Sequence, residues 1–109
     1  MANTYKVLAQ RAPTAATLFD IYAVPISNSA VISTMNICNT SFTTASSFRI
    51  AIRPANTALS SASYLAYDVP IAVGDSIALT MGVTLAATDV VSVYSAGNVT
   101  FNLFGSEVY

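Results

Sequence analysis

Residue types that carry most enzyme and metal chemistry are absent or scarce in this 109-residue chain. It contains no histidine, no tryptophan and a single cysteine. Without histidine, a Ser–His–acid or Cys–His arrangement cannot form, and the commonest general base and metal ligand are missing. Cys38 has no second cysteine in the chain to pair with, so an internal disulfide is excluded. We expect Cys38 to be a buried, inert thiol.

The five carboxylates are spread along the sequence rather than grouped. Asp68, Asp75 and Asp89 lie at or beside predicted turns, where Asp is favoured because it bonds the local backbone. The sequence has no Asp-x-Asp pattern of a calcium loop, and its four glycines match neither phosphate-binding fingerprint. We therefore predict a protein that is not an enzyme, with no catalytic residues, no cofactor and no metal site.

Positive charge is equally scarce: the chain has four Lys and Arg residues and a net charge of −1. Nucleic-acid binding needs several cations on one face, so no nucleic-acid partner is expected. No apolar run approaches the roughly 20 residues of a membrane span, so no membrane association is expected. The first residues lack a basic segment followed by an apolar core, which predicts synthesis in the cytoplasm without a secretion signal.

Apolar and small polar residues fill the composition instead. Hydrophobic residues make up 54% of the chain and charged residues 8%, against about 25% charged in an average soluble domain. A surface built from Ser, Thr, Asn and Ala is desolvated at low cost, and the cores of protein interfaces are likewise poor in charge. This favours a self-associating subunit, a trimer or hexamer, over a monomer with a neutral polar surface.

Short apolar runs alternate with turn residues at a spacing typical of an all-β sandwich or barrel. We predict one domain over residues 1–109, an antiparallel β-sandwich of about seven or eight strands with jelly-roll or immunoglobulin-like topology. Because Pro13 interrupts the first run, residues 1–16 are either a strand or an extended arm. One short helical turn is expected within residues 55–63. The predicted strands are 4–9, 17–24, 30–38, 46–53, 64–69, 76–81, 88–94 and 99–107.

Alternation along these strands assigns one face of each to the core. The segment 46–53 is the clearest case, because Phe48, Ile50 and Ile52 alternate with Arg49 and Arg53. The complete set of core candidates is Val7, Phe19, Ile21, Val31, Met35, Ile37, Phe48, Ile50, Ile52, Leu65, Tyr67, Ile77, Leu79, Val91, Val93, Phe101 and Leu103.

Four residues are candidates for contacts between subunits. Arg49 and Arg53 lie on one strand face about 13 Å apart, too far apart to hold a single anion. They either make two separate contacts to a neighbour or are solvated edge charges. Tyr5 and Tyr109 are added because tyrosine offers contact area with a polar tip. The six tyrosines leave open a second use, a patch that binds sugars. Two glycosylation sequons, at Asn39 and Asn98, are interpreted as turns.

Several segments resemble small virion structural proteins of tailed bacteriophages, especially those of cyanobacterial and other aquatic hosts. They are Tyr5-Lys-Val-Leu-Ala-Gln, Ile52-Arg-Pro-Ala, Tyr67-Asp, Leu85-Ala-Ala-Thr-Asp-Val-Val-Ser-Val-Tyr and the final Phe104-Gly-Ser-Glu. The similarity extends over nearly the whole chain. It implies a non-enzymatic protein of the virion, and it carries no functional residue over to this sequence.

From composition and resemblance together we expect a capsid decoration, or cement, protein that binds itself and other virion proteins such as the major capsid protein. One alternative is a tail, baseplate or fibre-attachment component that contacts tail proteins. A second alternative is a receptor- or glycan-binding module on the virion surface.

Overall fold

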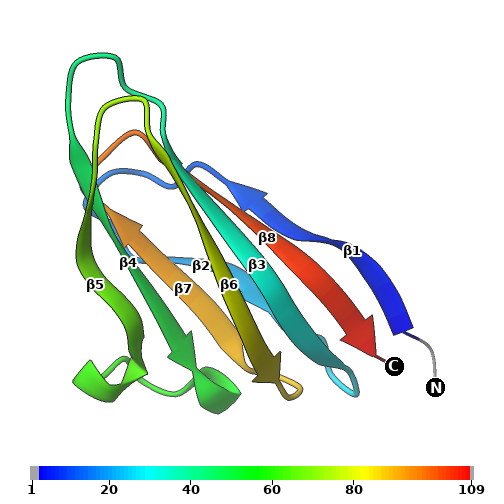
Figure 1. The fold of residues 1–109 in the computed structure, drawn as a ribbon. Helices are drawn as coiled ribbons and strands as arrows, with labels where there is room; N and C mark the ends of the chain where they lie inside the picture. Colours follow the sequence, from blue (N-terminus) through cyan, green and yellow to red (C-terminus); the bar gives the residue numbers. More distant parts are fainter. Residues whose placement is uncertain (1–2, 109) are drawn as a thin grey trace.

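The computed structural model describes residues 3–108, apart from the side chains of Asn3 and Met81. Eight antiparallel strands form two four-stranded sheets packed face to face (Figure 1). Sheet A holds, in spatial order, β1 (Asn3–Arg11), β8 (Val99–Val108), β3 (Ser29–Asn39) and β6 (Ser76–Leu85). Sheet B holds β2 (Phe19–Ala23), β7 (Val90–Ser95), β4 (Ser46–Arg53) and β5 (Tyr64–Ile71).

The strand order is that of a jelly roll. Only β4 and β5 are neighbours both in sequence and in a sheet; every other connection within the described chain crosses between the sheets. The predicted β-sandwich with eight strands is confirmed, and of its two topologies the jelly roll is the one present. The N-terminal segment is a strand, because residues 3–11 form β1 and pair along β8.

The core lies between the two sheets and consists almost entirely of aliphatic side chains and two phenylalanines. Phe48 of sheet B meets Phe101 of sheet A edge to face, with ring centroids 6.3 Å apart. The alternation predicted for residues 46–53 is confirmed at Phe48 and Ile50, which are fully buried. Burial of such side chains contributes about 1.5–3 kcal/mol each, so this layer holds the sheets together.

Two core predictions fail at register shifts. Val31 was expected inside, but it is 36% exposed and Ile32 is buried in its place. The β3 pairings with β6 and β8 both shift between Ile32 and Thr34. Simple alternation therefore breaks there, and the positions that point to the core change from one side of the shift to the other. Val7 is 49% exposed for the same reason, because β1 shifts register on β8 between Val7 and Ala9.

The predicted inward face of β5 is also wrong. Leu65 and Tyr67 are 53% and 57% exposed, whereas Ala66 and Val69 pack against the core. Asp68 has φ of 51°, a left-handed conformation that breaks the two-residue alternation of this strand. Pro70 follows the predicted strand 64–69, yet it lies inside β5, where an edge strand tolerates its missing donor. Phe19, the remaining outlier, is 36% exposed on the short edge strand β2.

Connections gather at the two ends of the sandwich (Figure 1). The β4–β5 connection contains two 3-10 turns, Pro54–Asn56 and Ser61–Ser63, where a single helical turn was predicted. The connections β1–β2, β3–β4, β5–β6 and β7–β8 share one end of the molecule. The β2–β3, β4–β5 and β6–β7 connections share the other end (Figure 1).

Candidate functional site

The four predicted contact residues lie on different faces. Arg49 and Arg53 project from β4 on the outer face of sheet B, as the alternation predicted. Tyr5 lies on β1 in sheet A and is 81% exposed. Tyr109 lies outside the described residues. The structure therefore brings the two arginines onto one face and separates both from Tyr5.

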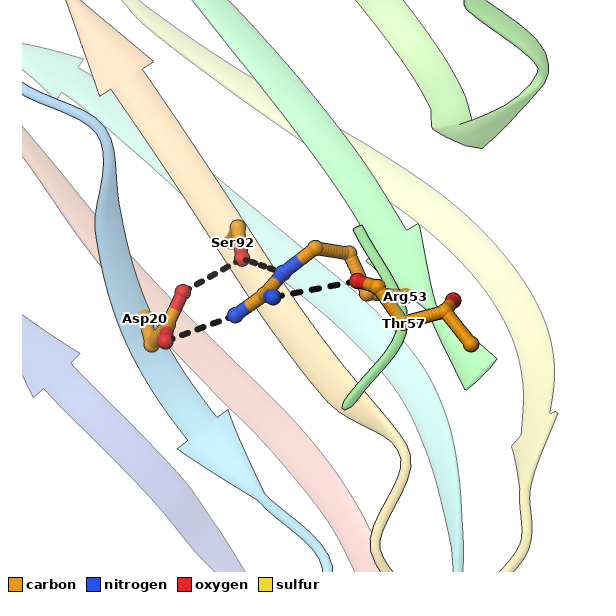
Figure 2. A network of polar contacts seen from close by, with 4 residues as sticks. All are labelled: Asp20, Arg53, Thr57 and Ser92. Atoms are coloured by element: carbon orange, nitrogen blue, oxygen red, sulfur yellow. Dashed lines mark hydrogen bonds and ion pairs between the residues drawn. The ribbon is translucent and has the colours of Figure 1, made fainter. Parts of the chain in front are cut away.

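Arg53 joins three strands and the residue that follows the first 3-10 turn through its guanidinium (Figure 2). It donates to Asp20 Oδ2 at 2.7 Å, to Ser92 Oγ at 3.1 Å and to the Thr57 carbonyl at 3.1 Å. Ser92, which is fully buried, donates in turn to Asp20 Oδ1 at 2.6 Å. Every arm of the guanidinium is thus engaged within the chain, and the network stabilises sheet B.

Arg49 is held between aromatic rings. Its guanidinium carbon lies 4.3 Å from the ring centroid of Tyr67 and 4.5 Å from that of Tyr94, and two of its nitrogens bind Asp68 at 2.5 and 3.2 Å. Tyr64 meets Tyr67 edge to face at 4.8 Å. The hydrogen bonds from Arg49 hold the pKa of Asp68 below its usual value, and the same bonds raise the pKa of Arg49. Planar aromatic, cationic and carboxylate groups therefore share one exposed patch.

A shallow groove runs beside this patch. It has a volume of about 470 Å³ and is lined by Leu59, Ser60, Ser61, Tyr64 and Tyr67. The groove offers two phenol rings and two hydroxyl-bearing serines, a combination suited to flat, hydroxylated ligands such as sugars. The sequence indicated the tyrosines as a group, but only the fold shows which two line the groove.

Glu107 is a buried carboxylate that sequence reasoning did not single out. It is 6% exposed, pairs with Lys6 Nζ at 2.6 Å, and accepts a 2.5 Å hydrogen bond from Tyr22. The bond from Lys6, followed by that from Tyr22, lowers the pKa of Glu107, while burial is the main cause that raises the pKa of Tyr22. Because Tyr22 belongs to sheet B, the cluster closes the side of the sandwich where β1 and β2 meet.

Among the described residues, strand pairing places no charged residue in an outward row of sheet A. Strand pairing places Gln10, Asn102, Asn36 and Ala78 in one outward row across all four strands. Lys6 falls in the inward row of Gly105 and Ile32, and Glu107 falls in that of Ala30. Arg11 lies in the inward row of Phe101 and Ile37. We call this outer surface of β1, β8, β3 and β6 the neutral face.

All four charges of the two arginine networks, in contrast, lie on the outer side of sheet B. The sequence shows this difference in charge between the two sheets only in part. It shows that β3 and β6 contain no charged residue and that β8 contains Glu107 alone. Cys38 belongs to the neutral face and is partly exposed, so the prediction that it is buried is wrong.

Two large apolar side chains stand out from the connections. Phe42 in the β3–β4 connection is 95% exposed, and Ile26 in the β2–β3 connection is 80% exposed, at opposite ends of the sandwich (Figure 1).

Asn39 anchors the loop of Phe42, since its buried amide donates to the carbonyls of Thr44 and Ile71 and accepts from the Ser41 backbone. The Asn39 sequon is therefore a structural turn, as predicted.

Within residues 3–108 no group of three or more His, Cys, Asp or Glu side chains is placed to hold a metal ion. No helix in this part of the chain is long and apolar enough to cross a membrane. Compared with known proteins, the chain matches no protein-family model and no curated protein.

Proposed function

We propose that this chain is a non-enzymatic structural subunit of a bacteriophage particle, with capsid decoration as its leading role. The observation that carries the proposal is the neutral face. A broad surface of hydroxyl, amide and small apolar groups can be covered by another protein without stripping water from ions. The resemblance of the sequence to virion proteins of tailed phages supports the same role, and jelly rolls are common among capsid proteins.

Such a subunit works by mass action. A protein that binds the assembled capsid and not its dissociated subunits stabilises the capsid in proportion to the logarithm of its free concentration. No chemical step is required, and the engaged guanidiniums of Arg49 and Arg53 fit a supporting role inside the subunit better than the contacts to a neighbour considered from sequence.

Copy number in purified particles tests this proposal and separates capsid from tail. Quantitative mass spectrometry of purified virions is expected to find the chain in hundreds of copies, as a lattice of capsid sites requires. A few dozen copies or fewer would place it in the tail, baseplate or fibre attachment. Absence from the particles would refute a virion role altogether.

The groove on sheet B favours a second candidate function, binding of a glycan at the particle surface. Tyr67 and Tyr64 would supply the aromatic surfaces and Ser60 and Ser61 the hydroxyl contacts. A glycan array probed with the wild type and with Tyr67→Ala tests it, and binding must be lost in the variant. Tyr94→Ala is the matched control, because Tyr94 also contacts Arg49 but does not line the groove.

A further inference from the structure

A β-sandwich has four edge strands, and an unprotected edge is a template for pairing with another strand. Three edges here carry protective features. On β1 these are Lys6, Arg11 and a register shift, and on β2 they are a length of five residues and Asp20. On β5 they are Asp68 in a left-handed conformation and Pro70. Charge, bulges, shortness and proline are the features that natural proteins use to prevent pairing at an edge.

The fourth edge, β6, lacks these features over its first half. Its ten residues include no charge and no proline. Residues 76–80 pair without a shift along residues 38–34 of β3, and the register changes only beyond Thr80, next to Gly82 with φ of 61°. On the opposite side of β6, no described strand pairs with it, so its outward backbone groups have no strand partner (Figure 1).

The side chains of this segment are also incompletely covered. Ile77 and Leu79 point toward the core, yet both are only partly buried, whereas their β3 partners Ile37 and Met35 are fully buried. The difference arises because β6 has a neighbouring strand on one side only. A further strand placed beside β6 would cover these two apolar side chains as well as bonding the free backbone.

We propose that β6 pairs antiparallel with β6 of a second copy of this chain, with the two-fold axis at Ala78. That register sets Ala78 against itself, Ile77 against Leu79 of the second copy, and Ser76 against its Thr80. Small residues then meet on the axis, apolar residues meet on the inner side and hydroxyls meet on the outer side. The segment is thus complementary to itself, as an isologous interface requires.

A second copy fits β6 better than the β1 edge of a neighbour does. Pairing with β1 would place an uncharged strand against one that carries Lys6, Arg11 and a bulge. Pairing of β6 with itself introduces no like charges and joins two copies of sheet A into one continuous sheet with a doubled neutral face.

The proposed contact is small. Five residues span about 17 Å, and the molecule is 20 Å through its thinnest direction. The contact area is therefore of the order of 300 Å² per copy, below the roughly 800 Å² of a standard interface. Pairing is expected to be weak in dilute solution and to be reinforced by the other contacts of an assembly.

Disulfide trapping tests the pairing in the full chain. In a Cys38→Ser background, Ala78→Cys would bring two thiols together on the axis, and mild oxidation should give a covalent dimer of twice 11.4 kDa on a non-reducing gel. Asn36→Cys is the matched control from the same outward row, one strand further in. Its thiols would be too far apart to bridge, since disulfides need Cα atoms within about 7 Å. We expect Ala78→Cys to cross-link roughly tenfold faster than this control, because pairing raises the effective concentration of its thiols.

Gln10→Cys, at the β1 end of the same row, distinguishes pairing of β6 with β6 from pairing of β6 with β1 of a neighbour. Equal cross-linking rates for the variants at positions 78, 36 and 10 would overturn the proposal. Cross-linking only in a mixture of Ala78→Cys and Gln10→Cys would also overturn it, because the contact would then join β6 to β1. The inference refines how the proposed assembly is built: if cross-linking fails while the chain is abundant in particles, the structural role stands and only the β6 contact is lost.

Discussion

At the scale of single residues, the two arginines of β4 show how identical side chains four residues apart acquire different importance. Arg53 holds a buried hydroxyl, Ser92, and its own side chain is 14% exposed. Arg49 pairs with Asp68 in a more open patch, and its own side chain is 25% exposed. Exposed ion pairs contribute little, whereas removing one partner of a buried polar group is costly.

Arg53→Ala should therefore destabilise the protein more than Arg49→Ala. We expect a loss of about 2 kcal/mol in the free energy of unfolding for Arg53→Ala, because Ser92 and Asp20 lose their shared partner. For Arg49→Ala we expect a smaller loss, because its ion pair with Asp68 is screened by solvent. Urea unfolding of both variants measures the difference. Equal losses would contradict the importance given to Ser92.

Glu107 should make stability depend on acid pH. The folded state lowers its pKa from 4.5, so the stabilisation is complete above that value and is lost as pH falls through the lower folded pKa. Glu107→Gln should cost about 2 kcal/mol at pH 7, because the charged hydrogen bonds to Lys6 and Tyr22 are lost.

Urea unfolding of the wild type and Glu107→Gln at pH 7 and pH 3 checks this expectation. The gap between the two proteins should be smaller at pH 3, because below pH 4.5 the unfolded wild type gains a proton that the folded state binds only at lower pH. A gap that is unchanged at pH 3 would show that the loss comes from packing and not from charge.

At the scale of elements, one glycine fixes how β8 meets β3. A Cβ added at Gly105 would lie 2.0 Å from the Val31 carbonyl oxygen, where only backbone could move to make room. Gly105 pairs with Ile32, directly beside the register shift of β3. The glycine thus permits the close approach of the two strands at the point where the inward face of β3 changes.

Gly105→Ala should accordingly cost about 3 kcal/mol, the upper range for overpacking. Gly82→Ala is the comparison: Gly82 has φ of 61° but nothing within 4 Å of an added Cβ, so about 1 kcal/mol of backbone strain is expected. Thermal unfolding of the two variants ranks them. If Gly82→Ala were the more destabilising of the pair, the close strand approach would not be the controlling feature.

At the scale of the whole molecule, charge is divided between the two outer surfaces. Sheet B carries two internally paired arginines, and the neutral face of sheet A carries no charge among the described side chains. If the neutral face is the surface that an assembly covers, a single charge at its centre should block assembly without affecting the fold.

Asn102→Lys tests this, because Asn102 lies mid-row on the neutral face. The free energy of unfolding should change by no more than about 0.5 kcal/mol, as for most surface substitutions, while incorporation into particles in an infected or reconstituted system is lost. Thr14→Lys, exposed in the β1–β2 connection, is the control and should be incorporated normally. Normal incorporation of Asn102→Lys would show that another surface is used.

The sequence by itself determined the all-β class, the strand count and most of the core, because alternation and turn residues act over short distances. It predicted residues 46–53 as a strand with its two arginines outward, and the structure confirms this. It failed at Val31, Leu65 and Tyr67, since a bulge or a left-handed residue reverses the inward face without leaving a local signature.

Only the tertiary structure decided what depends on residues distant in sequence. Tyr22 meets Glu107 across 85 positions, Arg53 meets Asp20 across 33, and Tyr64 and Tyr67 become the wall of a groove only when the β4–β5 connection folds beside them. The strand order likewise selected the jelly roll and left β6 at an edge. Alternation specifies which way a side chain points, but the neighbour it meets is set by the order and register of strands that lie far apart in the sequence.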